Sequence, residues 1–219
     1  MREANKFQQT GEWFNERTGK LTGSRMEAAM SFLKAKKDEE PKEAADRRKL
    51  KVEILCERMT GNIVPKYVTL DMQWGNEQEP MAKEFITSKT GWSIRDLGFI
   101  DHPSIPLCGC SPDGYIEQEN ALVEIKCPTS QTHVSWLFAA KQDAKWFPPE
   151  HIPQMLLQSA CFAGLPVWFA SFDPRMPEDQ KLLLRKFVPT QEQIDDVEEH
   201  ARRFLREVET MFDQITQRD

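Results

Sequence analysis

Apolar side chains recur at helical spacing in five parts of the chain. The predicted helices run from after Pro41 to near Gly61, over residues 77 to 90, 130 to 141 and 153 to 163, and from 190 toward the end. Their apolar stripes are Val52, Leu55 and Met59 in the first, Met81 and Phe85 in the second, and Ile194, Val197, Ala201, Leu205, Val208 and Phe212 in the last. Glycines follow several of these segments and are typical helix stops.

A different pattern occupies residues 92 to 127. Its apolar runs are short, branched or alternating, and Asp-Gly, Pro and Asn separate them, which predicts several antiparallel strands. The clearest strand is Leu-Val-Glu-Ile-Lys-Cys at 122 to 127, and two more are predicted over 167 to 172 and 182 to 188. Helices before, between and after these strands predict an α/β fold with one central mixed sheet flanked by helices.

The bulk composition fits one ordinary globular domain. The chain has 219 residues, of which 39% are hydrophobic and 29% charged, so disorder is not expected to dominate. No apolar run is long enough to span a membrane, and the polar amino terminus shows no signal peptide, so a cytoplasmic protein is expected. Five cysteines without a CxxC pair support neither a disulfide framework nor a zinc ribbon and predict reduced, mostly buried thiols.

Three residues carry the strongest chemical signal. Glu124 and Lys126 are two positions apart on a predicted strand and therefore point to the same face. Asp113, in Ser-Pro-Asp-Gly, precedes Glu124 by eleven positions, so the preceding strand could bring its carboxylate beside Glu124. Carboxylates in this arrangement suit Mg²⁺ or Mn²⁺, which can support phosphodiester hydrolysis, while the lysine can orient water or stabilise charge. The sequence therefore predicts a metal-dependent phosphodiesterase site.

Each part of this pattern also has a purely structural interpretation. Pro-Asp-Gly alone is a common turn, and Glu-x-Lys alone is usually a solvated strand face. Glu79 alone could be a surface carboxylate, and Gln154 an ordinary polar residue. The ordered combination favours the metal site over these interpretations.

Several motifs make the chain resemble the phage lambda exonuclease family, the YqaJ-like, viral-type alkaline exonucleases of the PD-(D/E)xK superfamily. They are WFNERTGKLTGS at 13 to 24, WGNEQE at 74 to 79, CSPDG at 110 to 114, VEIKCP at 123 to 128, the helix of Gln154, and FASFDPRM at 169 to 176. The resemblance implies a restriction-endonuclease-like core. It divides the single domain, residues 1 to 219, into an N-terminal helical part (1 to 62), a catalytic core (63 to 188) and a C-terminal helix (189 to 219).

The resemblance also implies roles for individual residues. Metal ligands fall on Asp113, Glu124, the Ile125 backbone carbonyl and Glu79, which together would hold two Mg²⁺ ions, with Mn²⁺ as a substitute. The active-site lysine falls on Lys126, and Gln154 would support that lysine and the scissile phosphate.

A second group implied by the resemblance would bind a 5′-phosphate. Its members are Arg17, Thr22, Ser24 and Ser111, whose guanidinium and hydroxyl donors suit a terminal phosphate. Two alternatives stay open, since Arg17 could form a surface salt bridge and Ser24 could be a helix N-cap. Met72 occupies the place of an apolar wedge between separating DNA strands, although core packing is its alternative.

The implied activity is a processive 5′-to-3′ exonuclease that degrades one strand of linear double-stranded DNA with a 5′-phosphorylated end to mononucleotides. It would leave a 3′ single strand for a single-strand annealing protein, in the host cell of a phage or prophage. Two alternatives are a structure-specific or restriction-type endonuclease and a noncatalytic protein that binds DNA ends. The intact Asp113, Glu124 and Lys126 set argues against the last.

A ring-shaped homotrimer around DNA is also implied by the resemblance. The net charge of −6 per chain is unfavourable for DNA binding, and three copies would carry three times that charge, −18. A locally basic channel is therefore required. Its candidate lining residues, which could equally be solvated surface charges, are Lys34, Lys36, Lys37, Arg47, Arg48 and Lys49.

Overall fold

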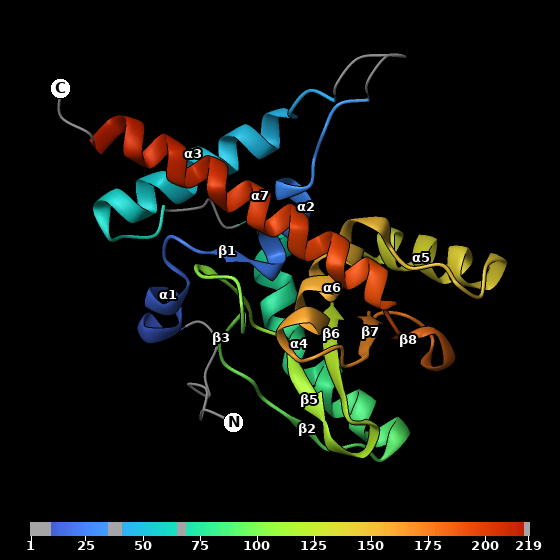
Figure 1. The fold of residues 1–219 in the computed structure, drawn as a ribbon. Helices are drawn as coiled ribbons and strands as arrows, with labels where there is room; N and C mark the ends of the chain where they lie inside the picture. The colour runs from blue at the N-terminus through green and yellow to red at the C-terminus, as the bar shows by residue number, and fades with distance from the viewer. Residues whose placement is uncertain (1–9, 35–40, 65–68, 217–219) are drawn as a thin grey trace.

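A five-stranded mixed sheet forms the centre of the structure, a computed structural model that describes residues 10 to 34, 41 to 64 and 69 to 216 (Figure 1). Its strands are, in spatial order, β2 (Ile94–Arg95), β5 (Gly114–Ile116), β6 (Ala121–Lys126), β7 (Val167–Phe172) and β8 (Leu182–Phe187). β6 lies in the middle, antiparallel to β5 and parallel to β7. The predicted mixed sheet and its antiparallel strands are confirmed.

Helices cover both faces of this sheet, with α4 (Leu70–Thr90) on one face and α6 (Ile152–Cys161) on the other. The remaining α-helices are α1 (Gly11–Arg17), α2 (Met26–Ala29), α3 (Ala45–Thr60), α5 (Ser130–Gln142) and α7 (Gln191–Thr216). Alternate residues of β6 enter two different apolar clusters: Leu122 packs with Met155 and Leu157 of α6, whereas Val123 packs with Ile86 of α4. The central strand is therefore buried on both sides, which explains its nearly continuous apolar sequence.

A second, three-stranded sheet attaches the N-terminal segment to the core. Its order is β1 (Leu21–Thr22), β4 (Cys108–Cys110) and β3 (Ile100–Asp101), with β1 parallel to β4. This pairing joins segments that lie far apart in the sequence. It brings the residues around β1 close to the segment that leads from β4 into β5.

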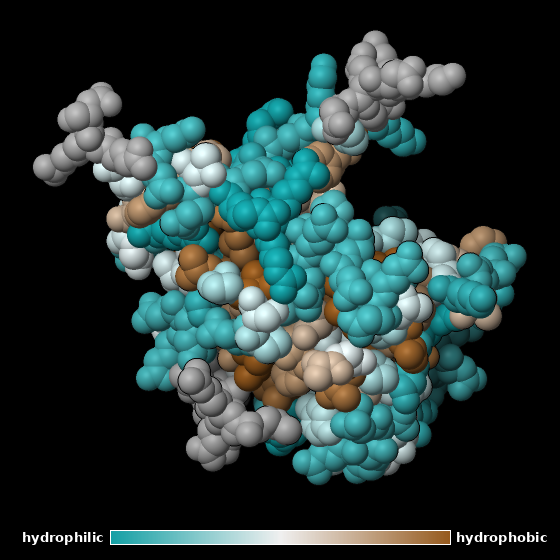
Figure 2. Space-filling view, viewed as in Figure 1, coloured by the Kyte–Doolittle hydropathy of each residue, from teal (hydrophilic) through white to brown (hydrophobic). Residues whose placement is uncertain are grey.

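The long α7 crosses the N-terminal helices and α6, as Figure 1 shows. The predicted capping box starts it, because the Thr190 hydroxyl accepts from the Gln193 N–H and the Gln193 side chain accepts from the Thr190 N–H. In Figure 2 most of the visible face is hydrophilic, and apolar side chains show in a hollow beneath this helix. Ile105, Leu107 and Leu205 line a pocket between α7 and the loop before β4.

The second predicted helix begins earlier than expected. We expected it from residue 77, but α4 starts at Leu70, and the Thr69 hydroxyl caps it by accepting from the Met72 N–H. Gly75 and Pro80 disfavour helix in the sequence, yet the helix continues through both residues. The N-cap and packing against the sheet outweigh these two local preferences.

Two predicted apolar stripes were wrong in detail. In α3, Leu55 is buried as predicted, but Val52 and Met59 are each 51% exposed, and Leu50 and Ile54 complete the buried face. In α4, Phe85 packs against the core as predicted, but Met81 is 48% exposed, and Ala82 and Ile86 are the buried residues. The buried face of α3 also includes Arg47 and Glu57, so counting apolar residues located only part of each buried face.

The close approach of β3 and β4 gives a test of the fold. A Cβ atom at Gly109 would lie closer than 3.0 Å to the Ile100 carbonyl oxygen and to the Phe99 ring. We expect Gly109→Ala to lower the free energy of unfolding by about 1–3 kcal/mol through overpacking. The measurement is urea denaturation followed by circular dichroism.

Gly75→Ala is the matched control for this prediction. Gly75 lies inside α4 with open space where a Cβ would be placed. Alanine there should raise the free energy of unfolding by about 0.5–1 kcal/mol, because it favours the helix. Equal stabilities of the two variants would contradict the described packing at Gly109.

Candidate active site

Glu124 and Lys126 lie two positions apart on β6, so they share one face of the central sheet. Ile125 points to the opposite face, where it belongs to the apolar cluster of Ala82 and Ile86. The Glu124 side chain is 1% exposed, whereas the Lys126 side chain keeps 28% of its surface exposed. The strand therefore holds a buried carboxylate beside a lysine whose side chain is partly exposed.

Donors surround the buried carboxylate of Glu124. Lys126 forms an ion pair with Oε1, and the Gln154 amide donates to the same oxygen at 2.6 Å. The Gln158 amide donates to Oε2 at 2.5 Å. Both glutamines belong to α6 and lie one turn apart. Since a buried carboxylate without donors is costly, α6 fixes the orientation of Glu124.

Asp113 enters the same site from the turn before β5. Its Oδ2 accepts a hydrogen bond from the Ile125 N–H at 2.6 Å, and the residue is buried. Burial raises the pKa of Asp113 well above its usual range, and the negative charges of Glu124 and Glu79 raise it further. Carboxyl groups are therefore concentrated at the C-terminal end of β6, where their mutual proximity and burial disfavour the ionised form of Asp113.

The charges around Lys126 oppose the effect of its burial. Burial alone lowers the pKa of this ammonium group, but Glu124, Asp113 and Glu79 outweigh burial and the pKa is raised. Lys126 is consequently charged at neutral pH. It can donate hydrogen bonds to a water molecule or to an anion.

Glu79 approaches the site from α4. Its Oε1 pairs at 2.9 Å with Lys83, which also contacts Asp96 at 2.8 Å. The charge of Glu79 contributes to the pKa shifts of both Asp113 and Lys126, which puts it at the edge of the same site. The structure therefore brings together the five side chains implied for catalysis: Asp113, Glu124, Lys126, Glu79 and Gln154.

The donor chemistry of this site suits a hard cation, although the side chains alone form a sparse ligand set. Among the described residues, no group of three or more His, Cys, Asp or Glu side chains is arranged to hold a metal ion. Two buried carboxylates nevertheless meet here, and a divalent cation would offset both the burial and the repulsion that raise the pKa of Asp113. Asp113 and Glu124 fit such an ion, and the Ile125 carbonyl and Glu79 remain predicted ligands.

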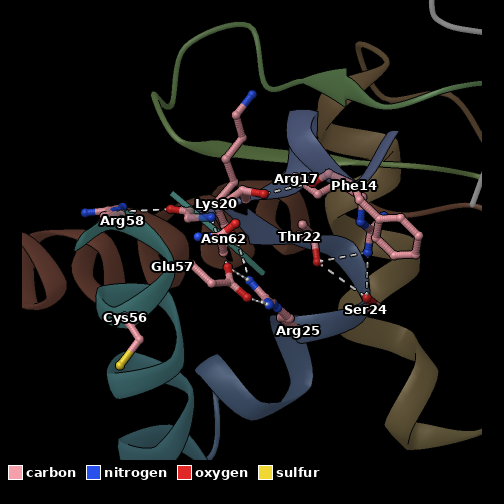
Figure 3. Close-up of polar contacts among 12 residues, drawn as sticks. Phe14, Arg17, Lys20, Thr22, Ser24, Arg25, Cys56, Glu57, Arg58 and Asn62 are labelled. Atoms are coloured by element: carbon pink, nitrogen blue, oxygen red, sulfur yellow. Dashed lines mark hydrogen bonds and ion pairs between the residues drawn. The ribbon is translucent and has the colours of Figure 1, made fainter. Parts of the chain in front are cut away.

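A second polar cluster surrounds Arg17 (Figure 3). Its Nη1 donates to the Ser111 hydroxyl at 3.1 Å, and its Nη2 donates to the hydroxyls of Thr22 at 3.5 Å and Ser24 at 3.4 Å. We call these four residues the Arg17 cradle. Sequence reasoning had grouped the same four, and the structure brings them together from α1, β1, the turn after β1 and the loop after β4.

Trp13 is a further member of this region that the sequence had not singled out for a role. Its indole N–H donates to the Ser111 hydroxyl at 3.0 Å, and the Arg17 guanidinium lies 4.1 Å from the centre of its ring. Burial lowers the pKa of Arg17 to about 10, and the like charge of Arg25 contributes to this shift. Arg17 is still cationic at neutral pH, with hydroxyl groups as its nearest polar partners.

The cradle and the carboxylate site are neighbours. Ser111 and Asp113 belong to one short segment, two positions apart. On the other side, a Cβ at Gly23 would lie 3.5 Å from the side chain of Gln154, so the turn between Thr22 and Ser24 packs directly on α6. An anion held by Arg17 would therefore lie beside the site that contains Glu124.

Two alternatives from the sequence can now be decided. Ser24 is not a helix N-cap: the short 3₁₀ turn and α2 that follow β1 have no side-chain cap, and the Ser24 hydroxyl contacts Arg17 instead. Met72 is not packed in the core, because 49% of its surface is exposed on α4. Its neighbour Leu70 is 84% exposed. The wedge role of Met72 stays a prediction.

One of the proposed channel cations is wrong. Arg47 is only 2% exposed and is held by Glu207 at 2.6 Å and Glu43 at 2.9 Å, so it joins α3 to α7 and cannot line a channel. Lys34, Arg48 and Lys49 are exposed. Lys36 and Lys37 lie outside the described residues.

Gln158 is the most important residue that sequence reasoning missed. A signal was present, since it lies four positions after Gln154 and therefore on the same face of a helix. Its chemistry alone gave no indication, because glutamine is a common surface residue. The burial of Glu124 beneath α6, visible only in three dimensions, makes the second amide necessary.

The fold and site together define a restriction-endonuclease-like protein, in which a carboxylate pair and a lysine meet on adjacent strands of a mixed sheet. The chain belongs to the YqaJ-like viral recombinase domain family, whose model matches residues 12–165. A comparison with curated protein sequences gives no match.

Comparison with solved structures also finds exonucleases. The chain superposes on two structures of LHK-Exo, an alkaline exonuclease from Laribacter hongkongensis, one of them in complex with dAMP. In each case the TM-score is 0.82 at 32% identity, over 94% of this chain and 96% of the other. A phage-related exonuclease from Haemophilus somnus 129PT shares the fold, with a TM-score of 0.69 at 14% identity over 90% and 96% of the two chains.

The Gln158 contact can be tested through stability. Gln158→Leu should lower the free energy of unfolding by about 1–3 kcal/mol, because one buried oxygen of Glu124 loses its donor. As a control, Gln191→Leu removes an exposed contact with Asp195 and should change stability by less than about 0.5 kcal/mol. Urea denaturation of both variants makes the comparison, and similar small effects would refute the role given to Gln158.

Proposed function

We propose that this protein is a Mg²⁺-dependent exonuclease that degrades one strand of linear duplex DNA in the 5′-to-3′ direction and leaves a 3′ single strand. The observation that carries the proposal is that a hydroxyl and guanidinium cradle lies beside a buried carboxylate and lysine site: Ser111 of the cradle is two positions from Asp113, and the turn at Gly23 packs on Gln154. A cradle for a terminal phosphate beside a hydrolytic site suits removal of nucleotides from a 5′ end. Family membership and the similarity to an alkaline exonuclease support nuclease activity.

The roles of the residues follow from their chemistry. Asp113 and Glu124, with the Ile125 carbonyl and Glu79, would hold up to two divalent cations, which supply charge neutralisation and a reactive water when bound. Lys126 would donate to the attacking water or to the scissile phosphate. Gln154 and Gln158 keep Glu124 in place. Arg17, Thr22, Ser24 and Ser111 would bind the 5′-phosphate through charge-assisted hydrogen bonds.

The nature of one relative's ligand agrees with this reaction. The LHK-Exo structure contains dAMP, a deoxynucleoside monophosphate. Mononucleotides of this kind are the expected products if each cut removes one residue from a 5′ end. A restriction-type or structure-specific endonuclease is the second candidate function, since the same carboxylate and lysine core could cut internally, but an endonuclease has no need of a cradle for a terminal phosphate.

The assembly and setting are also proposals. A homotrimeric ring would enclose the DNA and keep the enzyme on its substrate. Met72, which is exposed on α4, would act as an apolar wedge between the strands. Processivity, a single-strand annealing partner and a place in the cytoplasm of a phage-infected or prophage-carrying cell belong to the same proposal. Within the described residues, no helix has the length and apolar character needed to cross a lipid bilayer.

End dependence is the most direct test. Purified protein with Mg²⁺ should degrade a linear duplex with 5′-phosphates, act more slowly on the same duplex with 5′-hydroxyls, and leave a closed circle intact. Chelation by EDTA should stop the reaction. Gel analysis of products over time makes the measurement, and discrete internal fragments or equal loss of the circle would favour the endonuclease instead.

Lys126 allows a separate test of catalysis. Lys126→Ala should reduce cleavage by at least about a hundredfold, because a donor to the developing charge is lost. Binding to the same duplex, measured by fluorescence anisotropy in EDTA, should remain close to that of the unaltered protein. Cleavage at the original rate would show that Lys126 has no catalytic role.

A further inference from the structure

One buried carboxylate holds the loop that carries Thr22 and Ser24 of the Arg17 cradle. Glu57, in the last turn of α3, has a fully buried side chain, and it binds Gly19 and Arg25, which lie outside the cradle. Its Oε2 accepts from the Gly19 N–H at 2.9 Å and from Arg25 Nη1 at 2.9 Å, and its Oε1 accepts from Arg25 Nη2 at 2.5 Å (Figure 3). Glu57 thus binds both ends of the loop that separates Arg17 from α2.

The backbone between these ends is also fixed. The Gly19 carbonyl accepts from Arg58 Nε at 2.9 Å, and the Lys20 carbonyl accepts from Arg25 Nη1 at 3.0 Å. Gly19 has a φ of +71°, and a Cβ there would lie 2.8 Å from Cγ of Arg58. Glycine is therefore required at this turn, and both its N–H and its carbonyl are held by consecutive residues of α3.

The charge of Glu57 has a second effect. Arg25 lowers the pKa of Arg17 by electrostatic repulsion, whereas Glu57 acts in the opposite direction. Burial raises the pKa of Glu57, but Arg25 and the N–H groups of Gly19 and Val64 lower it by more, so the carboxylate stays ionised. It therefore neutralises Arg25, which would otherwise be a second free cation close to the cradle.

We propose that Glu57 is a positioning residue for 5′-phosphate recognition: it fixes the loop after Arg17 that carries Thr22 and Ser24, and keeps Arg25 from competing with Arg17 for the phosphate. This inference rests on the proposed function of the cradle. Stability alone gives no reason for the ion pair of Glu57 and Arg25, because replacing a buried pair with apolar side chains is often neutral or stabilising. A role in placing the cradle explains why both charges lie here.

The test uses the full-length protein and a DNA hairpin with a single open end, prepared with a 5′-phosphate or a 5′-hydroxyl. The quantity compared is the ratio of kcat/KM for the two ends, together with the ratio of Kd values for the same hairpins in EDTA. The variants are Glu57→Gln and the double replacement Arg25→Met with Glu57→Leu, which removes both charges together. Glu209→Gln is the control, because it removes the surface partner of Arg58 and leaves Glu57 unchanged.

We expect both phosphate-over-hydroxyl ratios to fall by about fivefold to thirtyfold in the two Glu57 variants, the change that one or two kcal/mol produces. The rate on the 5′-hydroxyl end should remain close to that of the unaltered protein, and Glu209→Gln should keep the original ratios. Thermal melting should show that the double variant remains folded.

Three outcomes would overturn the inference. Folded Glu57 variants that keep the original ratios would show that the cradle does not depend on this carboxylate. An equal loss of rate on both ends would mean that Glu57 supports the fold without selecting the phosphate. If the unaltered protein itself showed no preference for the 5′-phosphate, the proposed role of the cradle would fail first, and this inference would fail with it.

Discussion

A carboxylate buried in the middle of a sheet can remain charged only if donors reach both of its oxygens, and the surroundings of Glu124 follow from this requirement. β6 is the central strand, so the donors must come from the helix above it and from its own face. Gln154 and Gln158 of α6 and Lys126 of β6 supply them. The position of α6 therefore determines where the reactive side chains lie, and the turn after β1 packs against the same helix.

Much of this architecture could be predicted from the sequence. The alternation of Glu124 and Lys126 on a strand, the turn at Asp113 and the capping box at Thr190 depend on neighbouring residues, and the structure contains all three. The buried faces of α3 and α4 could be predicted only in part, because charged or small residues such as Arg47 and Ala82 occupy several of their buried positions. Which face a helix buries depends on what packs against it, and that information lies elsewhere in the chain.

In the candidate active site, too, features set by neighbouring residues could be predicted and features set by distant partners could not. The resemblance to the exonuclease family implied that Arg17, Thr22, Ser24 and Ser111 form a group, and the motifs of β5 and β6 identified the carboxylates. Trp13, Gln158 and Glu57 were missed because each acts through a partner that is distant in sequence or hidden by burial. Glu57 illustrates the difficulty. It lies in an ordinary charged helix, and only its contacts with Gly19 and Arg25 in the folded chain distinguish it from the other carboxylates of that helix.

The contact of Arg17 with Ser111 spans 94 positions of the chain. Closing so long a loop is entropically unfavourable, so the contact depends on the other contacts that bring α1 beside the segment after β4. During synthesis the first half of the cradle leaves the ribosome well before the segment that completes it. A nascent or truncated chain that lacks Ser111 therefore has an incomplete cradle.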